Sequence, residues 1–125
     1  MAHTIAAIAT AAQPAAIGIL RLSGDTAIET AQAVFTPQFG PALGQQPNRR
    51  LVLGTLRDRQ GRVIDQAMAV VCRAPNSYTG EDTAELHCHG APAVLAAGLE
   101  ALYAAGAQPA QPGEFTRRAF LNGRM

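Results

Sequence analysis

Glu85, His87 and His89 occupy alternate positions of one short segment, and their side chains can accept hydrogen bonds, transfer protons or bind metal. If this segment is a β-strand, the three side chains share one face, and Leu86 and Cys88 lie on the other. A carboxylate on such a face can accept two parallel hydrogen bonds from an amidine-like edge, as a pterin or a guanine presents. A solvated outer face fits the same pattern, and on pattern alone it is slightly favoured.

A metal site at the two histidines is a further interpretation. A structural zinc needs about four ligands and a catalytic zinc about three from the protein. Cys88 would point to the opposite face, and the only other histidine is His3. We therefore expect no metal here, and we expect Cys88 to be an inert core thiol.

Arg21 interrupts an otherwise apolar segment. Alternation places it with Ile17 and Ile19, on a face that we expect to be turned toward the core. A buried guanidinium requires a partner, because an isolated buried charge is costly. Either a structural ion pair with Glu85 or Glu81, or an anionic or polar ligand, would satisfy it.

Two further segments carry candidate residues. A polar loop, typical of a surface turn or of a pocket wall, holds Asn76, Ser77, Tyr78 and Thr79 in succession. Near the C-terminus, Phe115, Ala119 and Phe120 recur at helical spacing. We therefore expect Arg117 and Arg118 to face solvent. Arg124 follows Gly123 and could reach a pocket or fray.

Apolar periodicity and turn residues predict the elements that position these side chains. The expected helices are 26–35, 92–103 and 115–121, and the expected strands are 4–10, 17–22, 51–57, 63–73, 83–89 and 107–110. Segment 36–48, with three prolines and two glycines, is expected to be a loop. The order strand–strand–helix–strand–strand–strand–helix–strand predicts an α+β fold with a single mixed or antiparallel sheet.

Composition and the absence of certain motifs argue against several classes of function. The chain has 125 residues, enough for one domain, and a net charge of +1 with 15% charged residues, which gives no basic field for general nucleic-acid binding. It shows no signal peptide and no apolar run long enough to span a membrane. With only two cysteines, it is expected to be a cytoplasmic domain with free thiols. Neither a P-loop nor a dinucleotide-binding glycine motif occurs.

Three segments together resemble a known family. They are IGILRLSG at 17–24, APNSYTGED at 74–82 running into ELHCHG at 85–90, and PGEFTRRAFLNGR at 112–124. The chain is similar over essentially its whole length to the N-terminal domain of the MnmE (TrmE) family of tRNA modification GTPases.

The resemblance implies a folate-binding domain, similar to half of the folate-binding unit of the glycine-cleavage T-protein. It implies a homodimer that exchanges first strands and binds a tetrahydrofolate derivative, such as 5-formyl- or 5,10-methylene-tetrahydrofolate. The family's folate contacts match Arg21, Glu85 and Arg124, and the 76–79 loop would shape the pocket wall. The domain would span 1–121, with 122–125 starting a linker.

For the full protein, the resemblance implies a helical domain and a potassium-dependent GTPase domain that binds GTP and magnesium. It also implies a flavin-dependent partner of the MnmG (GidA) family and modification of C5 of the wobble uridine in tRNA. The chain stops directly after its last expected helix, so we expect a fragment that is not catalytic alone. Residues 12–16 lack the glycine-rich turn of relatives, and the alternative is therefore a structural dimerisation module without a working ligand site.

Overall fold

The computed structural model describes residues 3–10 and 15–124. One mixed seven-stranded sheet has the order β3-β4-β5-β6-β2-β1-β7. Its neighbouring strands run antiparallel, except that β1 and β7 are parallel. The strands are β1 Ile5–Ile8, β2 Ala15–Ser23, β3 Phe35–Pro37, β4 Val52–Arg57, β5 Val63–Cys72, β6 Thr83–Gly90 and β7 Gln108–Pro109. The predicted α+β class with a single mixed sheet is thus confirmed.

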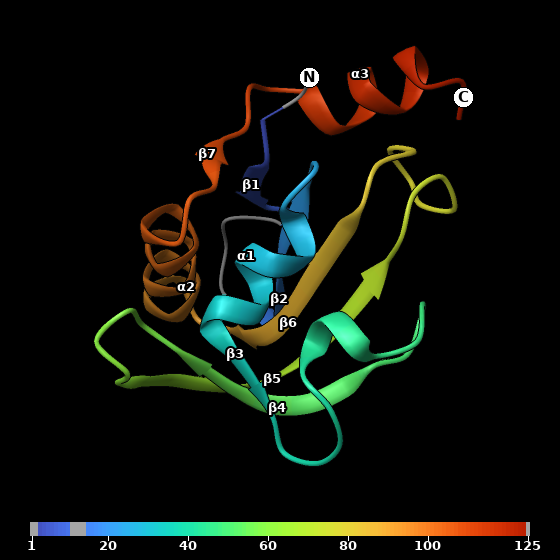
Figure 1. The fold of residues 1–125 in the computed structure, drawn as a ribbon. Helices are drawn as coiled ribbons and strands as arrows, with labels where there is room; N and C mark the ends of the chain where they lie inside the picture. Colours follow the sequence, from blue (N-terminus) through green and yellow to red (C-terminus); the bar gives the residue numbers. More distant parts are fainter. Residues whose placement is uncertain (1–2, 11–14, 125) are drawn as a thin grey trace.

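The helices are α1 Ala27–Val34, α2 Pro92–Ala104 and α3 Glu114–Leu121, with one 3₁₀ turn, η1, at Leu43–Gln45. Helices α1 and α2 share one core with the sheet, whereas α3 lies apart from them, near the start of β1 (Figure 1). Pro92 begins α2, as its fixed φ and missing N–H allow in a first turn. The three helices and the β4–β5 hairpin agree with the sequence prediction to within a few residues.

One face of the sheet is buried under α1 and α2, and the other is open. Leu20 and Leu22 of β2 are fully buried, and so is Leu86 of β6. On the opposite face, Ile17 and Met68 are exposed. The alternation predicted for β6 is confirmed. The expectation that Arg21 and its same-face neighbours point to the core is wrong, because the even-numbered residues of β2 meet the helices.

The prediction of a loop over 36–48 is also wrong in part. Phe35, expected to end a helix, begins β3, which pairs with β4 at the edge of the sheet. Leu43 of η1 is fully buried beside α1. This segment is held in place by its pairing with β4 and by the burial of Leu43. Neither contact produces a local periodicity in the sequence from which it could be predicted.

The remaining boundaries shift modestly. The first strand is shorter than predicted, and β2 is longer. The altered turn at 12–16 lies mostly outside the described residues. Among the residues that are described, no helix is long and apolar enough to cross a membrane.

Candidate functional site

The structure brings Arg21 and Glu85 together on the open face of the sheet. They are directly opposed in the β2–β6 register, and Arg21 Nε donates to Glu85 Oε2 over 2.9 Å. His87, two residues further along β6, lies 2.9 Å from the other carboxylate oxygen through its Nε2. Each oxygen of Glu85 therefore has one partner, and about a quarter of the side chain remains exposed (26%).

Two opposing effects act on the Glu85 carboxyl group. Partial burial raises its pKa, but the hydrogen bonds from His87 and Arg21, together with the charge of Arg21, outweigh burial and lower the pKa below its ordinary value. Glu85 is therefore ionised near neutral pH. An ionised carboxylate accepts about four hydrogen bonds, so acceptor sites are left for a further donor.

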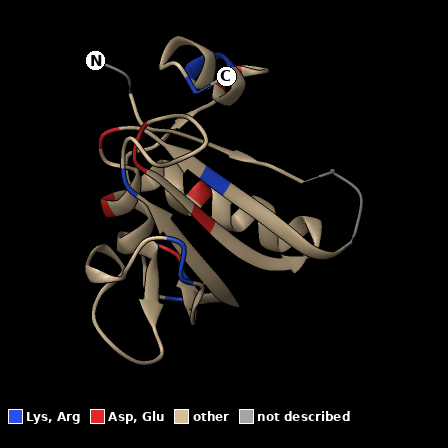
Figure 2. Cartoon of the chain, turned by 90° about the vertical axis from the view of Figure 1, so that its right-hand side faces the viewer, with Lys and Arg blue, Asp and Glu red and all other residues tan. Residues whose placement is uncertain are grey.

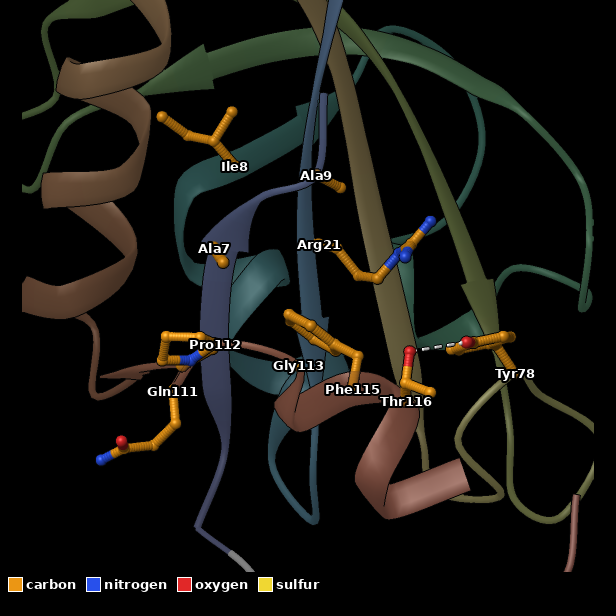
Figure 3. A pocket seen from close by; sticks show the side chains of 11 residues that line it. Ala7, Ile8, Ala9, Arg21, Tyr78, Gln111, Pro112, Gly113, Phe115 and Thr116 are labelled. Atoms are coloured by element: carbon orange, nitrogen blue, oxygen red, sulfur yellow. Dashed lines mark hydrogen bonds between the residues drawn. The ribbon is translucent and has the colours of Figure 1, made fainter. Parts of the chain in front are cut away.

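A cavity of about 410 Å³ opens beside Arg21, and Glu85 itself is not among the residues that line it. Arg21, Tyr78, Phe115 and Thr116 line one side of it, and β1 with residues 110–113 lines the other (Figure 3). The Arg21 Cζ atom lies 5.8 Å from the Tyr78 ring centroid and 5.9 Å from that of Phe115. Both distances fall within the range of cation–π contacts.

The chemistry of this cavity favours a flat, polar ligand. The guanidinium of Arg21 uses its Nε for Glu85, and within the described residues its two terminal nitrogens have no hydrogen-bond partner. They can donate to an oxo or carboxylate group. The two aromatic rings supply apolar walls, and a cavity of this size is typical of small-molecule sites.

The other candidate residues are distributed around the 73–82 loop. Tyr78 lines the cavity, and its hydroxyl lies 2.9 Å from Thr116 Oγ1. Ser77 is buried and its hydroxyl donates to the Glu81 carbonyl within the loop, whereas the buried Thr79 hydroxyl contacts that of Ser23 at the end of β2. The carbonyl of the exposed Asn76 accepts from Arg49.

Arg124 is not among the residues that line the cavity. Its Nε donates to the carbonyl of Ser77 over 3.0 Å, and its backbone N–H donates to Ala119. The structure therefore brings together Arg21, Glu85 and Tyr78, and places Arg124 against the backbone of the loop.

Sequence reasoning missed the role of the last helix. Phe115 lines the cavity, and Arg118 is buried where solvent exposure was expected. Arg118 forms ion pairs with Glu81 and Glu114, at 3.0 and 2.8 Å. The spacing of four residues between Glu114 and Arg118 was the one available signal, since such pairs meet on a helix surface.

The two histidines of β6 contact different carboxylates. Within the described residues, no cluster of three or more potential metal ligands occurs. His89 instead pairs with Asp65, whose carboxylate accepts from the backbone N–H of His89 and contacts its Nδ1, both at 2.8 Å. Cys88 is buried in the core, as expected, and burial together with the nearby charge of Asp65 raises its pKa to about 12.

Apolar side chains are exposed elsewhere on the open face, beside the polar Gln66, His87 and His89. Ile17, Leu51, Leu53 and Met68 are exposed and surround a shallow hollow of about 390 Å³. Figure 2 shows how few charged residues lie on the strands compared with the turns. A contiguous exposed apolar surface of this kind typically marks an interaction site.

The fold and the site define an α+β domain with an open sheet face and an arginine-bearing aromatic cavity. A family model described as GTP-binding protein TrmE N-terminus matches residues 4–124, and the chain belongs to this family.

Relatives in several bacteria carry the name tRNA modification GTPase MnmE. The chain is 51% identical over 127 aligned positions to the relative from Synechococcus sp. strain JA-2-3B'a(2-13), covering 100% of this chain and 27% of that protein. It is 50% identical to the relative from Akkermansia muciniphila and 49% identical to that from Symbiobacterium thermophilum, each covering 98% of this chain and 27% of the relative. The chain thus spans about a quarter of the length of these curated relatives.

Proposed function

We propose that this chain is the reduced-folate-binding, dimer-forming N-terminal domain of a GTPase that modifies C5 of the wobble uridine in tRNA. The family match supports the overall assignment. GTP, magnesium and potassium binding, and the contact with a flavin-dependent partner of the MnmG (GidA) type, belong in this proposal to the remainder of the protein. Residues 1–121 form the domain, and 122–125 begin the linker.

One observation carries the ligand assignment: a guanidinium that lines a cavity is flanked by two aromatic rings and hydrogen-bonded to an ionised carboxylate. The 2-amino-4-oxo edge of a pterin presents parallel N–H donors, and the unused acceptor sites of Glu85 complement them. The free terminal nitrogens of Arg21 complement an oxo, formyl or carboxylate oxygen. Tyr78 and Phe115 offer ring faces to the flat bicycle.

The ligand itself supplies the one-carbon unit when it is bound, and the residues of this chain only bind and orient it. Arg21 fixes the position of the Glu85 carboxylate from the adjacent strand, and His87 fixes it from the same strand. Arg124 supports the loop that carries Tyr78 by donating to the Ser77 carbonyl. In this arrangement Arg124 acts on the pocket through the loop.

Calorimetric titration with 5-formyltetrahydrofolate tests the proposal. The wild-type chain is expected to bind near one ligand per chain, and Glu85→Gln is expected to weaken binding by roughly tenfold or more, because hydrogen bonds to a charged group are lost. Glu29→Gln, at an exposed site on α1, is the matched control and should bind as the wild type does. Equal affinities of wild type and Glu85→Gln would exclude Glu85 from the site.

The open apolar face is the proposed dimer surface, with a second copy of this chain as its occupant and exchange of first strands completing the dimer. Light scattering after size exclusion measures the mass in solution. Leu53→Arg should yield monomers, because an unpaired buried charge in an interface is costly. Leu121→Arg, an exposed leucine on α3, should leave the dimer intact. A dimer that tolerates Leu53→Arg would place the interface elsewhere.

A second function, a structural dimerisation module without a working ligand site, is favoured by one feature. Both oxygens of Glu85 already have partners within the chain, so no acceptor is orphaned. A folded dimer that gives no heat and no thermal stabilisation with 5-formyltetrahydrofolate would support this function over folate binding.

A further inference from the structure

Arg118 is a buried guanidinium with no place in the Arg21 cavity. Its side chain is 10% exposed, and it bridges two carboxylates that are themselves nearly buried, Glu81 at 14% and Glu114 at 12%. Nη1 donates to Glu81 and Nη2 donates to Glu114. A buried arginine with two partners of opposite charge is satisfied, but removing it leaves two carboxylates without compensation.

The bridge joins segments that are far apart in the sequence. Glu81 lies in the 73–82 loop and also accepts from Ser23 Oγ at the end of β2, over 2.7 Å. The Ser23 hydroxyl contacts the hydroxyl of Thr79 in the same loop, over 2.6 Å. Glu114 lies at the start of α3, where it accepts from the backbone N–H of Gln111. Arg118 therefore ties the loop, the end of β2 and α3 into one polar cluster.

The loop and α3 each carry one aromatic wall of the cavity. Tyr78 projects from the loop and Phe115 from the first turn of α3, and the two rings flank Arg21 (Figure 3). The hydrogen bond between Tyr78 and Thr116 connects the same two segments on the cavity side. At the end of α3, the Asn122 amide donates to the Thr79 carbonyl over 2.9 Å.

We propose that Arg118 is a positioning residue that sets the distance between the Tyr78 and Phe115 rings around Arg21, from outside the cavity. The inference rests on the ion-pair bridge that Arg118 forms between the 73–82 loop, which carries Tyr78, and α3, which carries Phe115. The expected change in ligand affinity rests on the proposed folate function, whereas the expected change in how firmly the Tyr78 ring is held does not.

Tyr78 can be observed by itself. The chain has no tryptophan and two tyrosines, so a Tyr103→Phe background leaves Tyr78 as the only tyrosine. In this background, near-ultraviolet circular dichroism reports how firmly the Tyr78 ring is held, and acrylamide quenching of its fluorescence reports how accessible it is. Far-ultraviolet circular dichroism and thermal unfolding report the fold.

The variants are Arg118→Met, which keeps length without charge, and Arg118→Lys, which keeps one charge. Arg118→Met is expected to lose the Tyr78 dichroism band, to increase quenching, and to weaken 5-formyltetrahydrofolate binding roughly tenfold, as loss of charged hydrogen bonds implies. Arg118→Lys should recover part of each signal because it can satisfy only one carboxylate at full strength. Arg117→Met, the exposed neighbour on α3, is the control and should match the background.

An Arg118→Met protein that is only less heat-stable, with the Tyr78 band, quenching and affinity of Arg117→Met, would overturn the proposal. Should Arg118→Met fail to fold, Glu114→Gln removes one ion pair and is expected to shift the same signals in the same direction; unchanged signals would likewise overturn it. If the background protein binds no folate, the folate function fails, and the Tyr78 measurements still decide the role of Arg118.

Discussion

Arg21 and Glu85 face each other directly across β2 and β6, with Nε and Oε2 2.9 Å apart, although 64 residues separate them in the chain. The pair lies on the open face of β2 and β6, and Arg21 lines the cavity. The pair is a cross-strand ion pair and also the proposed folate contact, so its contribution to stability and its contribution to binding need separate measurements.

The energetic role is expected to be small. A double-mutant cycle with Arg21→Met and Glu85→Gln should give a coupling free energy of about 0.5–1 kcal/mol, because both side chains retain contact with solvent. Urea unfolding of the four proteins measures it. A coupling above about 2 kcal/mol would indicate a desolvated pair, contrary to the exposure seen here.

The pair also predicts a pH dependence. Because the pKa of Glu85 is lowered in the folded protein, the unfolded chain binds protons more readily, and acid favours unfolding. The stabilisation by Glu85 is fully present above its ordinary pKa of 4.5 and is lost as the pH falls through the lowered value. The difference in unfolding free energy between wild type and Glu85→Gln should therefore shrink between pH 6 and pH 3. A difference that stays constant with pH would contradict the lowered pKa.

The two thiols should differ in reactivity. Burial, with the charge of Asp65, raises the pKa of Cys88 to about 12, so almost no thiolate forms at pH 8. Cys72 is only half-buried. Native protein treated with Ellman's reagent at pH 8 should release close to one equivalent, and denatured protein two. In Cys72→Ser the native reaction should disappear; rapid labelling of this variant would show that Cys88 is accessible.

Gly54 of β4 leaves room for the neighbouring edge strand. A Cβ at this position would collide with the backbone carbonyl of Thr36 and with the Phe35 ring, both in β3. Gly54→Ala should therefore destabilise the protein by about 1–3 kcal/mol, although alanine generally suits a strand better than glycine. Thr55→Ala, whose side chain points to the open face, is the control. A neutral Gly54→Ala would mean that β3 can move away without cost.

Much of the fold was predictable because its signals are local. Alternation in β6 predicted correctly that Leu86 and Cys88 face the core and that Glu85 and His87 do not. Pro92 correctly predicted the start of α2, and the polar segment containing Gly61 correctly predicted the β4–β5 hairpin. The sequence allowed two carboxylates, Glu85 and Glu81, as ion-pair partners of Arg21, and only the strand register selected Glu85.

The errors concern long-range contacts. Arg118 was expected in solvent because the apolar stripe of its helix lies elsewhere, yet Glu81 approaches from the 73–82 loop and buries it. Phe35 was expected to end a helix and residues 36–48 to form a loop, yet Phe35–Pro37 pair with β4 as a strand.

The sequence by itself determined the class of fold, the alternation of the strands and the residue types available for a ligand, since periodicity and turn chemistry act over a few residues. Tertiary structure alone decided which face of β2 meets the helices, which carboxylate pairs with which arginine, and that Tyr78 and Phe115 flank Arg21. The physical reason is that a side chain's burial and its partners depend on what packs against it. Those neighbours come from segments tens of residues away, whose approach leaves no local pattern.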